Sequence, residues 1–318
     1  MTEVGVDIFK TKQLLDEGEV VAIPTETVYG LAANALDEKA VVKIFEAKNR
    51  PYFNPLIIHI PDANQLASYV EDIPDTIQKL MAKHWPGPLT VLLKKNENIP
   101  DIVTAGSPLV AVRVPQHPMC QELLQKLDYP LAAPSANPFG YISPVTAKHV
   151  SDQLKGKIPY VLDGGTSQIG LESTIVGYED EQVVVYRLGG VSLEEIEKKC
   201  GSARLMTKSE NSPQTSGMLK HHYSPTKELL FFEKEILLSQ LHEKDCILSF
   251  DKYEEFVSKE KQFLLSPKGD LNEAASNLFP LLHQLDKSSL SRILVKKLPE
   301  KGLGRAINDR LKRASSNY

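Results

Sequence analysis

The chain has 318 residues, of which 42% are hydrophobic and 25% are charged. This apolar fraction excludes a disordered chain, and the length predicts two domains or one large domain. With 37 basic and 41 acidic residues the net charge is −4, which argues against a protein that mainly grips phosphate backbones.

The beginning of the chain and its cysteines point to a compartment. No basic segment followed by an apolar run opens the chain, and no apolar stretch approaches about 18 residues, so we expect neither a signal peptide nor a transmembrane helix. Cys120, Cys200 and Cys246 lie far apart, without a CxxC pair or a zinc-binding spacing. We therefore expect inert thiols, no metal held by the chain and a cytoplasmic location.

Residues 1–200 alternate short apolar runs with segments of helical periodicity. Asp37 is suited to cap a helix that turns Val41, Ile44 and Phe45 to one side, and a second helix is expected over residues 74–84. Strand-like runs cover residues 19–24, 55–60, 89–94, 109–114, 173–178 and 182–188. Strands separated by helices predict a layered α/β domain with a mixed sheet.

Residues 201–227 are rich in Ser, Thr, Lys and Pro and show neither helical nor strand periodicity. This composition predicts an extended linker. Loops longer than about 15 residues without structure of their own are often functional. Because this one ends in two histidines and Tyr223, we expect it to have a function.

Residues 228–318 predict a second, smaller α/β domain. Leucines and alanines between residues 271 and 285 fall on one helical face, and Pro280 within this pattern should kink or split the helix. Strand candidates cover residues 228–233, 245–250, 262–266 and 291–295, and a last helix is expected over 304–314. The strand–helix order predicts a small parallel sheet.

The familiar nucleotide-binding and hydrolase motifs are missing from the sequence. There is no GxxxxGK[ST] loop, no GxGxxG after a strand, no GxSxG and no HExxH. Nucleotide chemistry in this chain would therefore need a different cradle.

Polar clusters instead follow the predicted strands and helices. Ligands in α/β sheets bind at strand ends, where loops serve them. Lys48, Arg50, Arg113 and Arg187 together suit a polyanion. The clusters are residues 24–30 (PTETVYG), 48–51 (KNRP), 134–137 (PSAN), 163–165 (DGG), 172–174 (EST) and 187–190 (RLGG).

Each cluster also has a simpler interpretation. PTETVYG, PSAN and DGG are typical of turns and helix caps, and KNRP suits the solvated end of a helix. His59 on an apolar strand is typical of a core histidine. Arg113 in an apolar strand needs a partner, which an internal ion pair would supply. Only the joint order of the clusters distinguishes these interpretations from a binding site.

In that order, together with residues 85–90 (WPGPLT) and 110–115 (VAVRVP), the clusters resemble the threonylcarbamoyl-AMP synthase family of the YrdC-like superfamily. The resemblance covers about residues 5–200. Residues 216–225 and 302–307 further resemble the long, two-domain form of that family.

The resemblance implies a fold and a reaction. A YrdC-like twisted mixed-sheet domain over residues 1–200 would be followed by a linker or lid over 201–227 and a small Rossmann-like parallel α/β domain over 228–318. The implied enzyme is a nucleotidyltransferase, L-threonylcarbamoyladenylate synthase. It converts L-threonine, bicarbonate or CO2 and ATP into threonylcarbamoyl-AMP and pyrophosphate. A separate tRNA-modifying transferase complex would use the product to form threonylcarbamoyladenosine.

The resemblance also assigns residues. Lys48 and Arg50 are implied as catalytic, and Mg²⁺ is expected to be held mainly by the ATP phosphates. The implied L-threonine pocket comprises Thr27, His59, Arg113, the backbone of Ala133, and Ser173. The implied ATP site comprises Arg50, Asn54, Leu109, Ser135, Ser143, Arg187 and Tyr223. Leu109 stands where a small polar residue is expected, so its contact would be through the backbone. Tyr223 would fold over the nucleotide as a lid that excludes water.

Two other functions are to be weighed. A double-stranded RNA-binding module would need cations spread over one face, whereas here they cluster with the implied threonine pocket. Residues 296–313 are nevertheless basic, and we expect at most a weak tRNA contact there. A carbamoyl transferase of hydrogenase maturation uses a related domain but carries zinc-finger cysteines, which this chain lacks.

Overall fold

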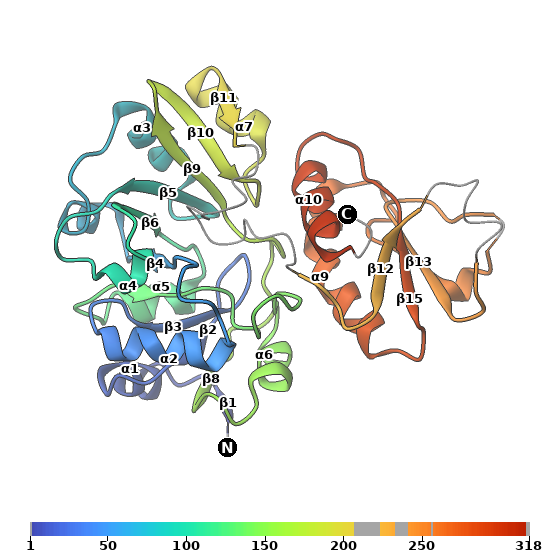
Figure 1. Ribbon diagram of the computed structural model, residues 1–318, viewed down its shortest axis with the longest axis horizontal. Coiled ribbons are helices and arrows are strands. Elements are labelled where there is room, and N and C mark those ends of the chain that lie inside the picture. Colours follow the sequence, from blue (N-terminus) through green and yellow to red (C-terminus); the bar gives the residue numbers. More distant parts are fainter. Residues whose placement is uncertain (1, 207–222, 233–240, 256, 316–318) are drawn as a thin grey trace. The chain divides into compact units, whose positions relative to one another are not determined.

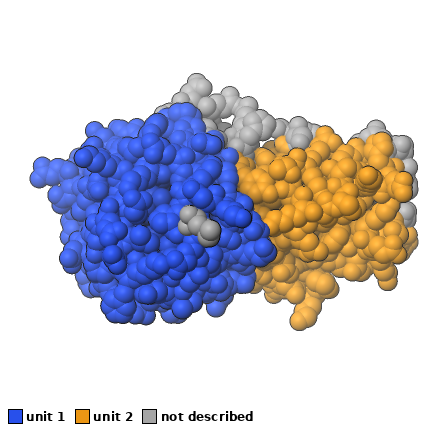
Figure 2. Space-filling model, turned by 90° about the horizontal axis from the view of Figure 1, so that it is seen from below, with its two compact units in different colours: residues 1–139, 143–168, 172–218 blue, residues 140–142, 169–171, 219–318 orange. Residues whose placement is uncertain are grey.

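The computed structural model describes residues 2–206, 223–232, 241–255 and 257–315. They form two compact units, blue and orange in Figure 2. The first unit comprises residues 1–139, 143–168 and 172–218, and the second comprises residues 140–142, 169–171 and 219–318. Most of the predicted linker, including its motif at residues 216–222, lies outside the described residues.

An eleven-stranded mixed sheet is the frame of the first unit (Figure 1), in the order β1-β8-β2-β3-β7-β4-β6-β5-β9-β10-β11. The strands are β1 (Glu3–Gly5), β2 (Val21–Ile23), β3 (Gly30–Asn34), β4 (Ile57–His59), β5 (Leu89–Lys94), β6 (Leu109–Arg113), β7 (Leu131–Ala132), β8 (Tyr160–Leu162), β9 (Thr174–Glu179), β10 (Gln182–Arg187) and β11 (Ala203–Leu205). The helices are α1 (Ile8–Asp16), α2 (Glu38–Lys48), η1 (Ala63–Ser68), α3 (Asp75–His84), α4 (Asp101–Thr104), α5 (Pro118–Leu124), α6 (Ala147–Leu154) and α7 (Leu193–Cys200). The predicted mixed α/β sheet is confirmed.

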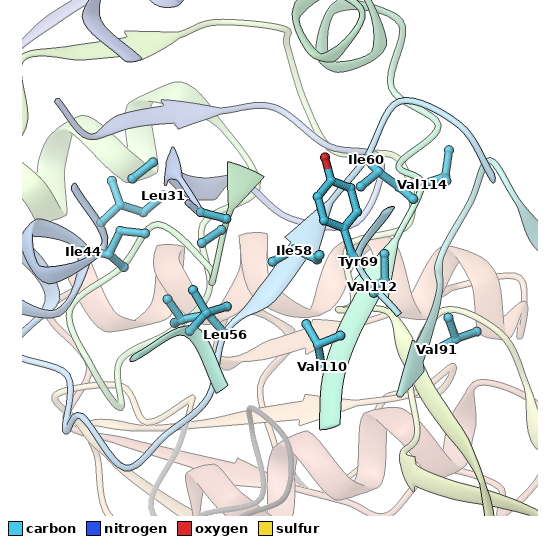
Figure 3. Packing of buried hydrophobic residues seen from close by; sticks show 14 of the residues in the cluster. Leu31, Ile44, Leu56, Ile58, Ile60, Tyr69, Val91, Val110, Val112 and Val114 are labelled. Carbon is cyan, nitrogen blue, oxygen red and sulfur yellow. The ribbon is translucent and has the colours of Figure 1, made fainter. Parts of the chain in front are cut away.

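Alternation along the strands sends successive side chains to opposite faces of the sheet. Ile58 of β4 and Val112 of β6 share a large buried cluster with Ile44 of α2 (Figure 3). Ile57 and Ala111, one residue away in each strand, belong to a different cluster. The face of β4 and β6 that α2 covers is therefore apolar. The side chains at the neighbouring positions of each strand, such as Ile57 and Ala111, point to the opposite face.

The elements that were predicted correctly have strong local signals in the sequence. The side chain of Asp37 accepts the N–H of Lys39 at the start of α2, as a helix cap should. The strand predicted over residues 89–94 is observed as β5, and the helix predicted over 74–84 is observed as α3 from residue 75. Several elements were not predicted, among them β1, β7 and β8, which have only two or three residues each. Such short strands carry too few residues to show a period.

The predicted linker begins differently from expectation. Residues 203–205 form β11, which pairs with β10 in parallel at the edge of the sheet. The prediction of no strand in residues 201–227 is therefore wrong at this point. Arg204 and Leu205 are exposed or nearly so, and an edge strand of this kind is held by backbone hydrogen bonds and needs no apolar pattern.

The second unit contains a four-stranded parallel sheet in the order β12-β15-β13-β14, as predicted. Its elements are β12 (Glu228–Phe231), β13 (Asp245–Ser249), η2 (Lys259–Lys261), β14 (Gln262–Leu264), α9 (Leu271–Lys287), β15 (Arg292–Val295) and α10 (Gly304–Ala314). Pro280 does not split α9, which runs through it. Buried residues on both sides of the proline, such as Ala275 and Leu282, hold the helix against its surroundings. Throughout the described part of the chain, no helix is long and apolar enough to cross a membrane.

Candidate active site

Several of the polar residues singled out in the sequence lie together at the ends of neighbouring central strands of the large sheet, along the edge that these strand ends form. His59 ends β4 and Arg113 ends β6, and the two are partners in the parallel register of these strands. Because β5 is antiparallel to β6 and parallel to β9, the starts of β5 and β9 lie at the same edge as the end of β6. This brings Ser173, next to β9, to that edge. By strand alternation, His59 and Arg113 share the face of Ile57 and Ala111, opposite α2.

Arg113 is the centre of this cluster and is almost completely buried. Its Nη2 lies 2.7 Å from Oε1 of Glu26, and its Nη1 donates to Oγ1 of Thr27 at 2.8 Å. Its Nε donates to the carbonyl of Gly87 at 3.2 Å. A guanidinium has five N–H groups, so one on each terminal nitrogen has no partner among the described residues. Both interpretations of Arg113 therefore hold, because it forms an internal ion pair and still has donors to offer.

The hydroxyl of Thr27 has a defined orientation. Oγ1 of Thr25 donates to the carbonyl of Val28 at 2.6 Å and lies 2.8 Å from Oγ1 of Thr27. Oγ1 of Thr25 also accepts the backbone N–H groups of Thr27 and Val28, each at 3.2 Å. The hydroxyl of Thr27 is thus held between Thr25 and Arg113, and a hydroxyl oxygen in this position suits an ammonium or hydroxyl group of a ligand.

His59 is neutral in this site. Burial and the charge of the neighbouring Arg113 lower the pKa of His59 to about 3. Its Nδ1 is buried and has no hydrogen-bond partner among the described residues. A buried polar atom without a partner costs free energy, so a ligand atom that bonds to Nδ1 would be favoured.

Ser173 connects this cluster to β10. Its hydroxyl lies 2.7 Å from Oγ1 of Thr90 in β5, and Arg187 donates to the Ser173 hydroxyl and carbonyl, both at 3.1 Å. Extending the β5–β6 register by one residue places Thr90 opposite Arg113. Arg113, Thr90, Ser173 and Arg187 thus lie on four neighbouring strands or at their ends.

The backbone N–H groups of Ala133 and Leu109 are both bonded within the protein. The N–H of Ala133 is used within the sheet, since it donates to the carbonyl of Ile57 at 2.9 Å. The N–H of Leu109 donates to Oγ of Ser107 at 3.1 Å. Contacts to a ligand at these two positions would therefore come from their carbonyls or from van der Waals packing.

Lys48 ties the helix α2 to the PSAN segment. Its ammonium is buried and donates to the carbonyls of Ser135 and Asn137, each at 2.5 Å, and its own carbonyl accepts the N–H of Phe139 at 2.7 Å. Burial lowers the pKa of Lys48 well below its ordinary value, and the nearby charge of Arg50 adds to this shift. The structure thus gives Lys48 a positioning contact that the sequence did not predict.

Arg50 and Asn54 form a buried pair in the loop after α2. Arg50 donates to the carbonyls of Asn54 at 3.1 Å and Pro55 at 2.9 Å, and its guanidinium lies 6.0 Å from the ring centroid of Phe139. Oδ1 and Nδ2 of Asn54 are buried without a partner in the described part of the chain. An amide in this state is a good candidate for a ligand contact.

Ser143 lies near the other buried carboxylate of the site. Its hydroxyl donates to Oε1 of Glu172 at 2.5 Å. A β-carbon at Gly189 would come within 2.3 Å of the Glu172 carbonyl, so the RLGG loop can approach this segment only as glycine. The DGG segment is a turn bonded to Tyr29, whose hydroxyl donates to the Gly165 carbonyl at 2.7 Å.

Tyr223 belongs to the second unit and is buried there. Its ring stacks on Phe279 with centroids 5.8 Å apart, and the guanidinium of Arg310 lies 5.0 Å from its centroid. Its φ of 67° is unusual for a tyrosine, so the surrounding packing holds the backbone in this conformation.

Two residues of the cluster were missed in the sequence. Glu26 and Thr90 are both buried and bond to Arg113 and Ser173 respectively. A buried arginine needs an anionic partner, and this was the signal for Glu26. Glu26 lies in a motif that was already singled out, residues 24–30. Thr90 also lies in such a motif, residues 85–90, but nothing in the sequence required a partner for its hydroxyl.

The first unit is thus an α/β ligand-binding domain whose buried cations and hydroxyls meet at one sheet edge, a site suited to a small anionic substrate. Two family models match the chain. Residues 13–189 match the model described as "Telomere recombination", and residues 191–316 match "Threonylcarbamoyl-AMP synthase, C-terminal domain". The chain belongs to the threonylcarbamoyl-AMP synthase family.

Named relatives cover nearly the whole chain. The threonylcarbamoyl-AMP synthase of Pyrococcus abyssi is 41% identical over 94% of this chain and 91% of its own length. That of Bacillus subtilis is 37% identical over 97% of this chain and 92% of its own. The crystal structure of P. abyssi Sua5 complexed with L-threonine has a TM-score of 0.91 at 38% identity, covering 99% of this chain and 97% of that one. These matches therefore include residues of both units.

Proposed function

We propose that this chain is an L-threonylcarbamoyladenylate synthase, a nucleotidyltransferase that makes threonylcarbamoyl-AMP and pyrophosphate from L-threonine, bicarbonate or CO2, and ATP. The observation that carries the proposal is Arg113, buried beside Thr27 and His59 with two N–H groups left for a ligand. The names of its full-length relatives support the same reaction.

L-Threonine would bind in the cluster around Arg113. The two remaining N–H groups of the guanidinium suit a carboxylate, which accepts two parallel hydrogen bonds from such a fork. Thr27 offers an acceptor and neutral His59 offers a buried nitrogen for the amine or the hydroxyl of the amino acid. Ser173 and the backbone of Ala133 would complete this pocket.

The reaction needs no protein nucleophile. The free amine of threonine attacks CO2 and loses a proton, which gives a carbamate. A carbamate oxygen then attacks the α-phosphate of ATP, and the bond to pyrophosphate breaks. Catalysis would come from orienting the reactants and from cations that stabilise the charge on phosphorus-bound oxygens.

ATP would bind to Arg50, Asn54, Ser135, Ser143 and Arg187, with a backbone contact at Leu109. Arg50 and Arg187 are both buried cations, and Asn54 has an unpartnered amide. Lys48 would act as a catalytic residue only if the third hydrogen of its ammonium reaches a phosphate, since two are bonded to carbonyls. Tyr223 as a lid over the nucleotide stays a prediction.

Mg²⁺ would arrive with ATP. Among the described residues no three His, Cys, Asp or Glu side chains gather into a metal-binding group. Mg²⁺ would take its ligands mainly from phosphate oxygens and water. When bound, Mg²⁺ would neutralise charge on the pyrophosphate.

The proposal includes a biological setting. The product would pass to a tRNA-modifying transferase complex, with at most a weak tRNA contact of the chain itself. Cys120, Cys200 and Cys246 are all free thiols, which supports a reducing compartment such as the cytoplasm. A double-stranded RNA-binding role without catalysis is not favoured by any observation on the site.

The test is a turnover assay. Purified protein is incubated with radiolabelled bicarbonate, L-threonine, ATP and Mg²⁺, and label in an adenylate is followed together with pyrophosphate release, with L-serine as the control. Threonine-dependent appearance of both products is the expected result. No turnover, with tight and salt-sensitive RNA binding instead, would overturn the proposal.

A further inference from the structure

Glu26 is a buried carboxylate to which the family resemblance assigned no role. Its side chain is 5% exposed and both of its oxygens are bonded. Oε1 lies 2.7 Å from Nη2 of Arg113, and Oε2 accepts the backbone N–H of Gln116 at 3.0 Å. Gln116 lies three residues beyond Arg113, so the same carboxylate holds the guanidinium and the segment that follows its strand.

We propose that Glu26 is a positioning residue that fixes the guanidinium of Arg113 in the orientation that receives the carboxylate of L-threonine. This inference rests on the proposed function and extends it. Three bonds, to Gly87, Thr27 and Glu26, hold the planar group at Nε, Nη1 and Nη2. With all three nitrogens bonded, the plane and the direction of the two remaining N–H groups are fixed before the ligand binds.

Glu26 has a second effect of opposite sign, which makes the idea testable. Its negative charge offsets that of Arg113, so an arginine without Glu26 would attract a carboxylate more strongly through space. Positioning therefore predicts weaker threonine binding when Glu26 is changed, whereas charge compensation alone predicts tighter binding. The sign of the change decides between the two roles.

The experiment measures equilibrium binding by the full chain, using calorimetry with L-threonine, ATP and L-threoninol, which lacks the carboxylate. The variants are Glu26→Gln, which removes the charge, and Glu26→Asp, which keeps it but shortens the side chain. The matched control is Glu19→Gln, the same change at an exposed carboxylate paired with Lys43. Thermal unfolding of each variant is recorded in parallel.

We expect Glu26→Gln to weaken L-threonine binding about tenfold or more, because an amide has a single uncharged acceptor oxygen and cannot accept from both Arg113 and the N–H of Gln116. Glu26→Asp should weaken it as well, although the charge is kept. The affinities for ATP and L-threoninol should stay within about twofold, and Glu19→Gln should change none of the three. In an Arg113→Gln background, Glu26→Gln should cause no further loss, because it acts only through the arginine.

Several outcomes would overturn the proposal. These are unchanged or tighter threonine binding by Glu26→Gln, equal losses for L-threonine and L-threoninol, or a further loss in the Arg113→Gln background. If Glu26→Gln alone does not fold, Glu26→Asp and the double variant, which has no unpaired buried charge, decide the question. Failure of the unmodified protein to bind L-threonine would instead refute the proposed function.

Discussion

The acceptor at Thr27 can be removed almost without changing the shape of the site. Valine has nearly the volume of threonine but no hydroxyl, so Thr27→Val leaves Nη1 of Arg113 without the partner it has at 2.8 Å. It also leaves Oγ1 of Thr25 without the hydroxyl partner that it has at 2.8 Å. A hydrogen bond to a charged group contributes about 1.5–3 kcal/mol. Since about 1.4 kcal/mol corresponds to a factor of ten, kcat/KM for L-threonine should fall roughly 10- to 100-fold.

The assay is pyrophosphate release at varied L-threonine and saturating ATP, followed by the reverse titration. The loss should appear in kcat/KM for threonine, while the KM for ATP should change little. Thr11→Val is the matched control, because Thr11 is equally buried and, within the described part of the chain, its hydroxyl bonds only to the carbonyl of Asp7. A Thr27→Val enzyme within twofold of the original, or a loss equal to that of Thr11→Val, would refute the reasoning.

Three further predictions concern His59, Ser173 and Asp286. Between pH 6.5 and about 3 the unfolded chain protonates His59 and the folded chain does not. Stability should therefore fall on acidification by up to about 1.4 kcal/mol per pH unit from this group, and the fall in denaturation free energy should be shallower in His59→Gln. Ser173→Ala removes the side-chain partner of Thr90 and Arg187 and should raise the KM for L-threonine or ATP about tenfold; unchanged steady-state kinetics would contradict this. Asp286→Ala deprives Tyr141, Thr226 and the Lys227 backbone of an acceptor and should lower the stability of the second unit by about 2–3 kcal/mol in thermal unfolding, with Asp286→Asn less affected.

Local patterns were enough for the elements that position the site. The five-residue β6 and the six-residue β5 show up as apolar runs, and α10 was predicted with its observed ends. β3 was missed, because it begins at Gly30, the last residue of a motif interpreted as a turn. Pro280 was expected to kink or split the helix, but α9 is not split. One lost backbone bond does not break a helix of 17 residues held by buried side chains.

The sequence by itself determined the family, the longer strands and helices, and which residues carry charge in apolar surroundings. These depend on neighbours a few residues apart, where periodicity and capping act. The tertiary structure alone decided that Arg113 pairs with Glu26, 87 residues away, and that Lys48 bonds to carbonyls of Ser135 and Asn137. Such contacts follow from the strand order β2-β3-β7-β4-β6, which brings segments distant in the sequence close together. No local pattern encodes that order, because it results from the packing of the whole sheet.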